Sequence, residues 1–473
     1  MSKSYEMNMT SGPILKKLII YAIPLIITNM LQLLFNAADV AVLGILVNDN
    51  AVAAVGASGS LINLVTSMFI GLASGVQVVL SRRVGAEDVK GSHRLVGTAL
   101  ATGLLGGLIL VAIGVPFARQ FLIWMNCAPS VLDGATTYLV IYFLGMPIMM
   151  LYNFIASILR AVGDTFRPML YLLIGGVANV ILNVFFIVVC NLTVEGVAIA
   201  TISSQAIALV LSIIALVKSS GYSKLNTKDL KIRKQEFIDI AKVGLPAGLQ
   251  SSLFSISNVL IQSTINSFGD LTMTANTIAS QFDGFIYQAG HSVALACMAF
   301  VGQNLGACDI PRVRKVIKQS VGVVAVFAFA LGVLMAVCSD ILCSIMTNDA
   351  EIIGYAKIRL YVMGIPYFLC GIMEVLSYSL RAIGRATTSM FISLFWGCVF
   401  RILWLSTFYL LNPTRDMVYL SYPISWIFAI VTFIIVLSPC LKQLSRELSK
   451  KTDKVEDSVK LDNEEIKEQA TTA

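Results

Sequence analysis

The sequence LRAVGD at residues 159–164 recurs 221 positions later as LRAIGR at residues 380–385. Other short matches keep nearly the same offset: Gly85-Ala86 with Gly306-Ala307, YFLGMP (Tyr142–Pro147) with YVMGIP (Tyr361–Pro366), and Pro24 and Asn36 with Pro246 and Asn258. Each match alone is weak, but several in the same order at a nearly constant offset indicate an internal repeat. The chain therefore consists of two similar halves, and this duplication decides its architecture.

The stretches around these matches are strongly apolar. Of the 473 residues, 57% are hydrophobic and 13% are charged, and the mean hydropathy is +0.82. Soluble domains carry about 45–50% apolar and about 25% charged residues, so this composition excludes a soluble protein. A helix needs about 20 apolar residues to cross the bilayer core. Twelve segments are long enough: 14–46, 52–80, 95–117, 134–159, 168–190, 196–217, 237–267, 272–301, 316–338, 353–380, 387–411 and 417–439.

Basic residues alternate between the loops in a way that orients the chain. Of the 34 lysines and arginines, all but Arg119, Lys357, Arg359, Arg401 and Arg415 lie in the N-terminal segment, in every second loop or in the tail. Short loops rich in Lys and Arg remain on the cytoplasmic side of a membrane. We therefore expect a multi-pass protein of the cytoplasmic (inner) membrane with both termini inside, and no nucleic-acid partner.

Six helices per half is an even number, so both halves enter the membrane in the same orientation. Such parallel repeats are related by an axis along the membrane normal. The sequence therefore predicts an all-α membrane protein with twelve transmembrane helices in two six-helix lobes related by a pseudo-two-fold along the membrane normal. We expect an N-lobe at 1–217, a cytoplasmic linker at 218–236, a C-lobe at 237–440 and a disordered cytoplasmic tail at 441–473.

One carboxylate in the first half has no obvious partner. Asp39 lies inside an apolar segment, and a charge at the bilayer centre costs about 2.5–3.5 kcal/mol on insertion scales. Counting 1.5 Å per helical residue from the nearest loop brings Asn179, Asn183 and Thr201 to a similar depth. These oxygen ligands suit an alkali cation. The group predicts a site for Na⁺ or a proton, although an amide network that only holds helices together is the alternative.

The second half contains a different set of ionisable groups. By the same depth counting, Asp283 and Arg401 are close enough to pair, either as a structural ion pair or in a substrate or coupling role. Glu374 corresponds to Asn153 in the repeat and is a candidate second binding group. His291 is expected to be a helix contact. Tyr287 belongs to a set of Met and aromatic side chains suited to flat cations.

These residues resemble those of the multidrug and toxic compound extrusion (MATE) family, bacterial type. The resemblance covers about residues 14–440 and rests on Gln32, Asn36 and Asp39 in Q-x-x-x-N-x-x-D, on the repeated Arg-Ala-x-Gly, and on GQNLGA at 302–307. It implies two lobes, a central cavity, and export of organic cations driven by Na⁺ or H⁺. Asp39, Asn179, Asn183 and Thr201 match the family's N-lobe cation-site pattern.

The chain departs from that pattern in the second half. Many members carry a carboxylate on helix seven, but here the stretch 249–259 reads LQSSLFSISNV. Asp283 or Glu374 would have to substitute. We expect substrate contacts or a second coupling site among residues of both halves: Gln32, Asn36, Asn153, Asp283, Tyr287, Glu374 and Arg401.

Three other functions fit the sequence less well. A flippase for a lipid-linked or amphipathic substrate is the nearest alternative, but its cavity should be strongly basic, and this sequence offers mainly Arg401. An enzyme is disfavoured because HExxH and GxxxxGK[ST] are absent. A channel is disfavoured because a two-lobe repeat indicates alternating access. We expect a monomeric transporter of small organic cations, with no cofactor beyond the coupling ion.

Overall fold

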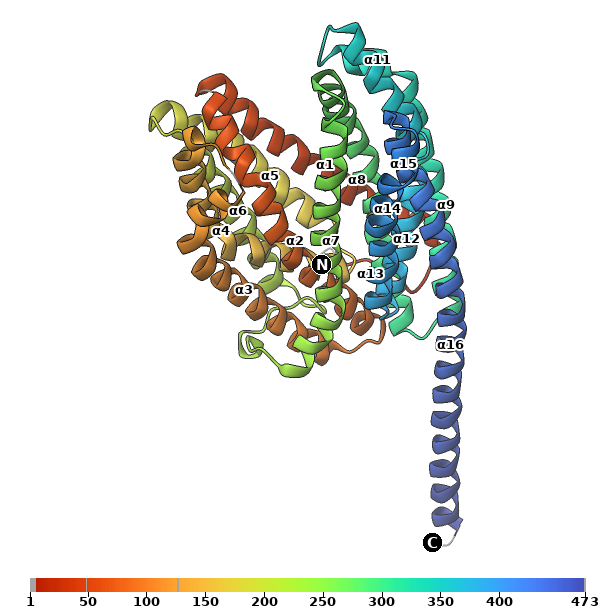
Figure 1. Cartoon of the computed structure of the whole chain (residues 1–473). Helices are drawn as coiled ribbons and strands as arrows, with labels where there is room; N and C mark the ends of the chain where they lie inside the picture. The colour runs from red at the N-terminus through yellow and green to blue at the C-terminus, as the bar shows by residue number, and fades with distance from the viewer. Residues whose placement is uncertain (1–5, 48, 126, 472–473) are drawn as a thin grey trace.

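The structure is a computed structural model that describes residues 6–47, 49–125 and 127–471, with side chains up to residue 448 except at 49, 60 and 227. Two helical bundles stand side by side (Figure 1). They converge at the end from which the C-terminal helix extends and diverge at the opposite end. We call these the closed end and the open end.

The first bundle, the N-lobe, is built from six long helices that each follow one apolar segment of the first half. They are α1 (Ile14–Leu46), α2 (Asp49–Gly85), α3 (Val89–Trp124), α4 (Pro129–Ala161), α5 (Phe166–Val184) with its π-helical end η1 (Phe185–Val189), and α6 (Val194–Lys218). A linker containing the short helix η2 (Thr227–Asp229) leads to the second bundle.

The second bundle, the C-lobe, follows the same order with more interruptions. It contains α7 (Lys234–Asn266), α8 (Asp270–Gly306), α9 (Ile310–Val337), α10 (Ser339–Ser344), α11 (Ala350–Arg359), η3 (Leu360–Gly364), α12 (Tyr367–Ala382), α13 (Ala386–Leu394), η4 (Phe395–Val399), α14 (Phe400–Ser406), α15 (Phe408–Leu411) and α16 (Arg415–Thr471).

The apolar helices match the predicted spans with two differences. By length and composition, ten helices of the described chain can cross a membrane, and an eleventh span is the pair Ala350–Gly364 and Tyr367–Ala382, bent by 41°. The sequence predicted one continuous helix there; Pro366 lies at the break, and proline cannot donate the backbone hydrogen bond that would continue it. The second difference is α7, which matches a predicted span but is not among the ten. Its serine-rich stretch makes it less apolar than those helices.

The last helix continues into the segment that the sequence assigns to the tail. The backbone of α16 continues as a helix to Thr471 and extends away from the bundles (Figure 1). The prediction of disorder rested on the lack of apolar residues that could pack. The segment is nevertheless rich in Lys and Glu, which have high helix propensity and need no packing partner.

Backbone details repeat between the lobes, as the duplicated sequence requires. Gly163 and Gly384, the glycines of the two Arg-Ala-x-Gly motifs, have φ of +95° and +86°. Asp88 and Asp309 each cap the next helix, accepting a hydrogen bond from the backbone N–H three residues later. The fold is therefore two copies of one six-helix unit, as the repeat predicted.

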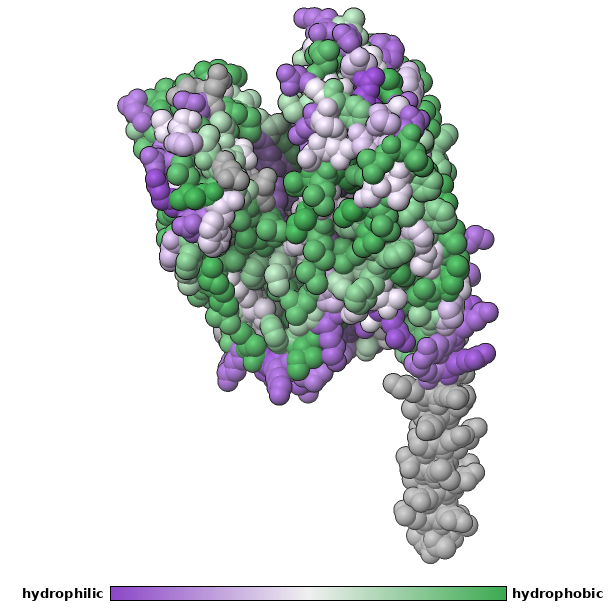
Figure 2. All heavy atoms as spheres, viewed as in Figure 1, coloured by the Kyte–Doolittle hydropathy of each residue, from purple (hydrophilic) through white to green (hydrophobic). Residues whose placement is uncertain are grey.

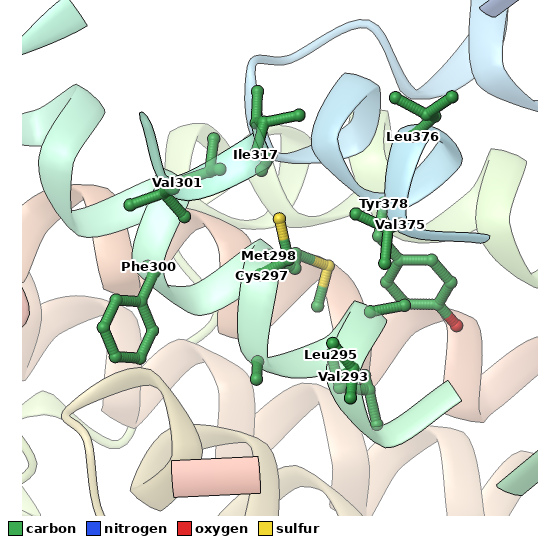
Figure 3. Close-up of a cluster of buried hydrophobic side chains, with 14 of the residues drawn as sticks. Val293, Leu295, Cys297, Met298, Phe300, Val301, Ile317, Val375, Leu376 and Tyr378 are labelled. Atoms are coloured by element: carbon green, nitrogen blue, oxygen red, sulfur yellow. The ribbon is translucent and has the colours of Figure 1, made fainter. Parts of the chain in front are cut away.

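The lobes meet through small residues and a continuous apolar core. Gly71 of α2 lies so close to α7 that a Cβ there would be 2.2 Å from the backbone nitrogen of Gly248. Near the closed end, the ring of Tyr21 from α1 packs edge-on against Phe300 of α8 at 5.8 Å. The core around Phe300 is formed where α8, α9 and α12 pack together (Figure 3). Hydrophobic residues dominate the outer surface between two hydrophilic ends (Figure 2).

Candidate cation and substrate site

The four residues predicted to form a cation site lie together in the N-lobe. Asn183 Nδ2 on α5 donates to Asp39 Oδ1 on α1 at 2.6 Å, and Thr201 Oγ1 on α6 lies 3.5 Å from Asp39 Oδ2. Asn179 Nδ2, one turn before Asn183, donates to Thr201 Oγ1 at 3.4 Å. Three helices thus aim one carboxylate, two amides and one hydroxyl at a common point.

Asp39 has no fixed counter-ion. None of the ion pairs in the described part of the chain includes it. Its polar neighbours Asn179 and Asn183 are almost fully buried, with 4% and 0% of their surface exposed. A carboxylate held there only by neutral groups can attract a mobile cation, because no positive side chain already neutralises it.

The chemistry of this group suits a hard cation. The buried Oδ1 of Asn183 accepts no hydrogen bond, which is costly for a buried acceptor unless a ligand satisfies it. Carboxylate, amide and hydroxyl oxygens are the ligands that hard cations prefer. No cluster of three or more His, Cys, Asp or Glu was found among the described residues. The residues present therefore fit Na⁺ or a proton better than a transition metal.

A cavity of about 470 Å³ opens beside Asp39. Binding sites for small molecules typically have volumes of about 300–1,000 Å³. Three residues predicted to contact substrate line it: Gln32, Asn36 and Asn153. Gly176 leaves space for the ring of Phe35, because a Cβ there would lie 1.8 Å from that ring.

Other lining residues were not singled out from the sequence. Tyr138, Tyr142 and Gln205 also border the cavity. Gln205 lies one turn after Thr201 on α6, so a search for polar residues four apart on an apolar helix would have found it. The tyrosines had no comparable signal, because aromatic residues are common in membrane helices.

In the C-lobe, the predicted pairing of Asp283 with Arg401 is wrong. Asp283 Oδ2 instead accepts a hydrogen bond from Arg359 Nε at 2.9 Å, and Arg359 also donates to Asn276. Arg401 Nε donates to Ser425 at 3.0 Å, and its guanidinium stacks 4.0 Å from the Tyr422 ring. The sequence counts Arg359 among the basic residues outside the cytoplasmic loops; in the structure it is the last residue of α11, just before η3, and is only 9% exposed.

Glu374 forms a second polar cluster in the C-lobe. Its two carboxylate oxygens contact Tyr287 Oη and His291 Nδ1, each at 3.1 Å. The Tyr287 and His291 rings stack with centroids 5.6 Å apart. The structure therefore brings Glu374 and Tyr287 together but separates them from Asp39, and His291 forms a helix–helix contact as expected.

The MatE family model matches residues 24–185 and again 246–405, which follows the two halves. The chain is similar to the probable multidrug resistance protein YoeA of Bacillus subtilis (strain 168), with 27% identity over 387 residues, 80% of this chain and 84% of that protein. The multidrug export protein MepA of Staphylococcus aureus is 23% identical over 399 residues, 82% of this chain and 86% of that protein.

Among solved structures, a multidrug resistance MATE family transporter of the MOP superfamily in an outward-facing conformation has the same fold. It superposes with a TM-score of 0.85 at 22% identity, covering 93% of this chain and 98% of that one. The family model covers more than half of the chain, in the two halves that the fold repeats. The chain therefore belongs to the MatE family of membrane transporters, not to a family of enzymes.

Proposed function

We propose that this protein is a secondary active antiporter that exports small organic cations in exchange for Na⁺ or H⁺ by alternating access. The observation that carries the proposal is Asp39: a carboxylate without a fixed counter-ion, beside a cavity large enough for a drug-sized molecule. The names of YoeA and MepA, which refer to multidrug resistance and multidrug export, agree with this substrate class.

Export of the substrate is coupled to entry of the ion if the Asp39 carboxylate binds the organic cation and the coupling ion in turn. Na⁺ would be held by Asp39, Asn179, Asn183 and Thr201, whereas a proton would bind to the Asp39 carboxylate alone. Binding of either ion neutralises the carboxylate and weakens its attraction for a cationic substrate. A substrate and a coupling ion that exclude each other at one site cross the membrane in opposite directions.

Substrate contacts are assigned to the cavity wall. Gln32, Asn36 and Asn153 offer hydrogen bonds, and the rings of Tyr138 and Tyr142 offer surfaces for a flat cation. In the C-lobe, Glu374 with Tyr287 is the second binding group. Asp283 and Arg401 are assigned a structural role, because each already has a partner inside the C-lobe.

The basic residues suggest how the molecule lies in the membrane. The connections at the closed end contain most of the lysines and arginines, including Arg82, Arg83, Arg312 and Arg314. By the positive-inside rule this end faces the cytoplasm of a bacterial inner membrane, with both termini inside. The open end, where Figure 2 shows a hollow between the lobes, then faces outward.

The test is efflux of a fluorescent organic cation from vesicles containing purified protein, under separately imposed Na⁺ and H⁺ gradients. We expect one gradient to drive export by the wild type and Asp39→Asn to abolish it. Asp133→Asn is the matched control, since this exposed residue pairs only with Arg119 at the surface. Full gradient-driven export by Asp39→Asn would remove the carboxylate from the mechanism. Scrambling of a fluorescent lipid, with no cation export, would instead favour a flippase.

A further inference from the structure

At the closed end, two reciprocal hydrogen-bonded contacts join the lobes. Arg82 Nε and Nη2 of the N-lobe donate to the carbonyl of Ala382 at 3.0 and 2.5 Å. Gln303 Nε2 of the C-lobe donates to the carbonyl of Ala161 at 2.9 Å. Gln303 and Ala382 lie 221 positions after Arg82 and Ala161, so the two contacts are related by the repeat. Both acceptors end a helix, where carbonyls carry a partial negative charge.

The segment before α1 is bound to the C-lobe at the same place. We call residues 6–12 the N-terminal strap. Met9 is fully buried, and its N–H donates to Gln303 Oε1 at 3.2 Å. The carbonyl of Met9 accepts hydrogen bonds from Asn304 Nδ2 at 3.2 Å and from Arg312 Nη2 at 3.3 Å. Arg312 Nη2 also donates to the carbonyl of Gly12 at 2.8 Å.

The strap is held by the N-lobe as well. Lys17 of α1 donates to the carbonyls of Asn8 at 2.6 Å and Ser11 at 2.9 Å. Met7 lies against the turn between α4 and α5, where a Cβ on Gly163 would be 2.5 Å from the Met7 carbonyl oxygen. The strap therefore contacts both lobes within a few residues, and the lobes cannot separate at this end while all these contacts persist.

The second half contains a corresponding crossing. Lys231 lies 222 positions after Met9, just before α7, and its carbonyl accepts a hydrogen bond from Thr98 Oγ1 on α3 at 3.0 Å. Gly97 allows this approach, because a Cβ there would be 2.0 Å from the carbonyl oxygen of Asp229. Each half thus sends the segment before its first helix onto the other lobe. Because this kind of contact occurs in both copies of the repeat, it belongs to the interface that joins the lobes.

From this geometry we propose that the N-terminal strap is a latch that keeps the closed end shut, and that it must leave Gln303, Asn304 and Arg312 before that end opens. The inference rests on the alternating-access function proposed above. Gln303 is the central residue, because its amide oxygen holds the strap while its amide nitrogen holds the end of α4. Loss of the strap therefore also loosens one of the two reciprocal contacts between the lobes.

The test measures the width of the closed end directly. Spin labels replace Lys90 on α3 and Lys315 on α9, two exposed residues on opposite lobes, in full-length protein without other cysteines in lipid nanodiscs. Pulsed electron paramagnetic resonance then gives the distance distribution, with neither substrate nor gradient present. Arg312→Ala removes the charged donor to the strap, and Met9→Pro removes the strap's own N–H. Arg314→Ala, an exposed neighbour, is the matched control.

We expect the ratio of long to short distances to rise about tenfold in Arg312→Ala, in line with the loss of hydrogen bonds from a charged group. It should rise about fivefold in Met9→Pro, which loses a bond between neutral groups, and stay unchanged in Arg314→Ala. Distributions equal to the control in both variants would overturn the latch. Thermal unfolding verifies folding, and Met9→Pro decides the question if Arg312→Ala does not fold. Because the measurement needs no transport, its result is independent of whether organic cations are exported.

Discussion

The two lobes share one helical scaffold but treat a buried carboxylate in opposite ways. In the N-lobe, Asp39 is surrounded by neutral amides and a hydroxyl and borders a cavity. In the C-lobe, Asp283 is 2% exposed and bonded to the guanidinium of Arg359. A free carboxylate can bind a mobile cation, whereas a paired one is already neutralised. The comparison indicates that duplication supplies the helical frame and that individual side chains decide whether a buried carboxylate in it is neutralised.

The repeat shows which positions changed. Asp39 corresponds to Ile261 in the second half, and Arg359, two residues before the matched Tyr361, corresponds to Val140 in the first. No basic residue stands at that position, and Tyr138, two residues earlier on α4, borders the N-lobe cavity. The N-lobe has the acid without the base, so a base introduced beside its cavity should make the N-lobe carboxylate behave like that of the C-lobe.

The largest expected effect comes from giving the N-lobe a base. Tyr138→Arg places a guanidinium beside the cavity, where it can neutralise Asp39 as Arg359 neutralises Asp283. Two unit charges 4 Å apart interact by about 4 kcal/mol at an effective dielectric constant of about 20, so we expect gradient-driven export to fall by more than about a hundredfold. Vesicle efflux and Na⁺ binding by calorimetry measure the loss.

Tyr138→Phe is the control for this substitution, because it keeps the ring and adds no charge. Its export should stay within a few-fold of the wild type. Normal coupled export by a folded Tyr138→Arg protein would show that a fixed cation at this position does not neutralise Asp39. The difference between the unpaired Asp39 and the paired Asp283 would then not explain transport.

The second prediction removes the base from the C-lobe. Arg359→Gln leaves Asp283 buried without its counter-ion, which typically destabilises a protein by about 3–5 kcal/mol. Thermal unfolding in detergent should show a clear loss of stability. The double variant Arg359→Gln/Asp283→Asn removes both charges and should recover most of it. If the single variant were as stable as the wild type, the ion pair would not be the structural element assigned here.

Much of this comparison could be predicted from the sequence, because its signals are periodic. The duplicated Arg-Ala-x-Gly motif and the spacing of apolar segments predicted two six-helix lobes. Counting residues along helices brought Asp39, Asn179, Asn183 and Thr201 together, because each lies in a helix that runs without a break from its nearest loop to that depth.

The same counting failed where helices are irregular. Arg359 lies just before the π-helical turn η3 and a 41° bend, so its distance from Asp283 does not follow from residue number. The strap was also missed. Its contacts run largely through backbone groups of Met9 and Gly12, and such contacts leave no pattern of side-chain types in a single sequence.

The smallest expected effect compares the two repeated glycines. Alanine at a position with φ near +90° is strained, so Gly384→Ala should cost about 1–2 kcal/mol of stability. The nearest atom to its Cβ would be Nη2 of Arg82 at 3.0 Å, at the end of a flexible side chain that can shift slightly while Nε still donates to Ala382. Gly163→Ala carries the same strain and also places its Cβ 2.5 Å from the Met7 carbonyl oxygen in the strap. We therefore expect Gly163→Ala to be the less stable variant in thermal unfolding, and to increase the long distances between labels at 90 and 315. Equal losses of stability in the two variants would mean that the strap yields without cost, because only the N-lobe glycine touches it.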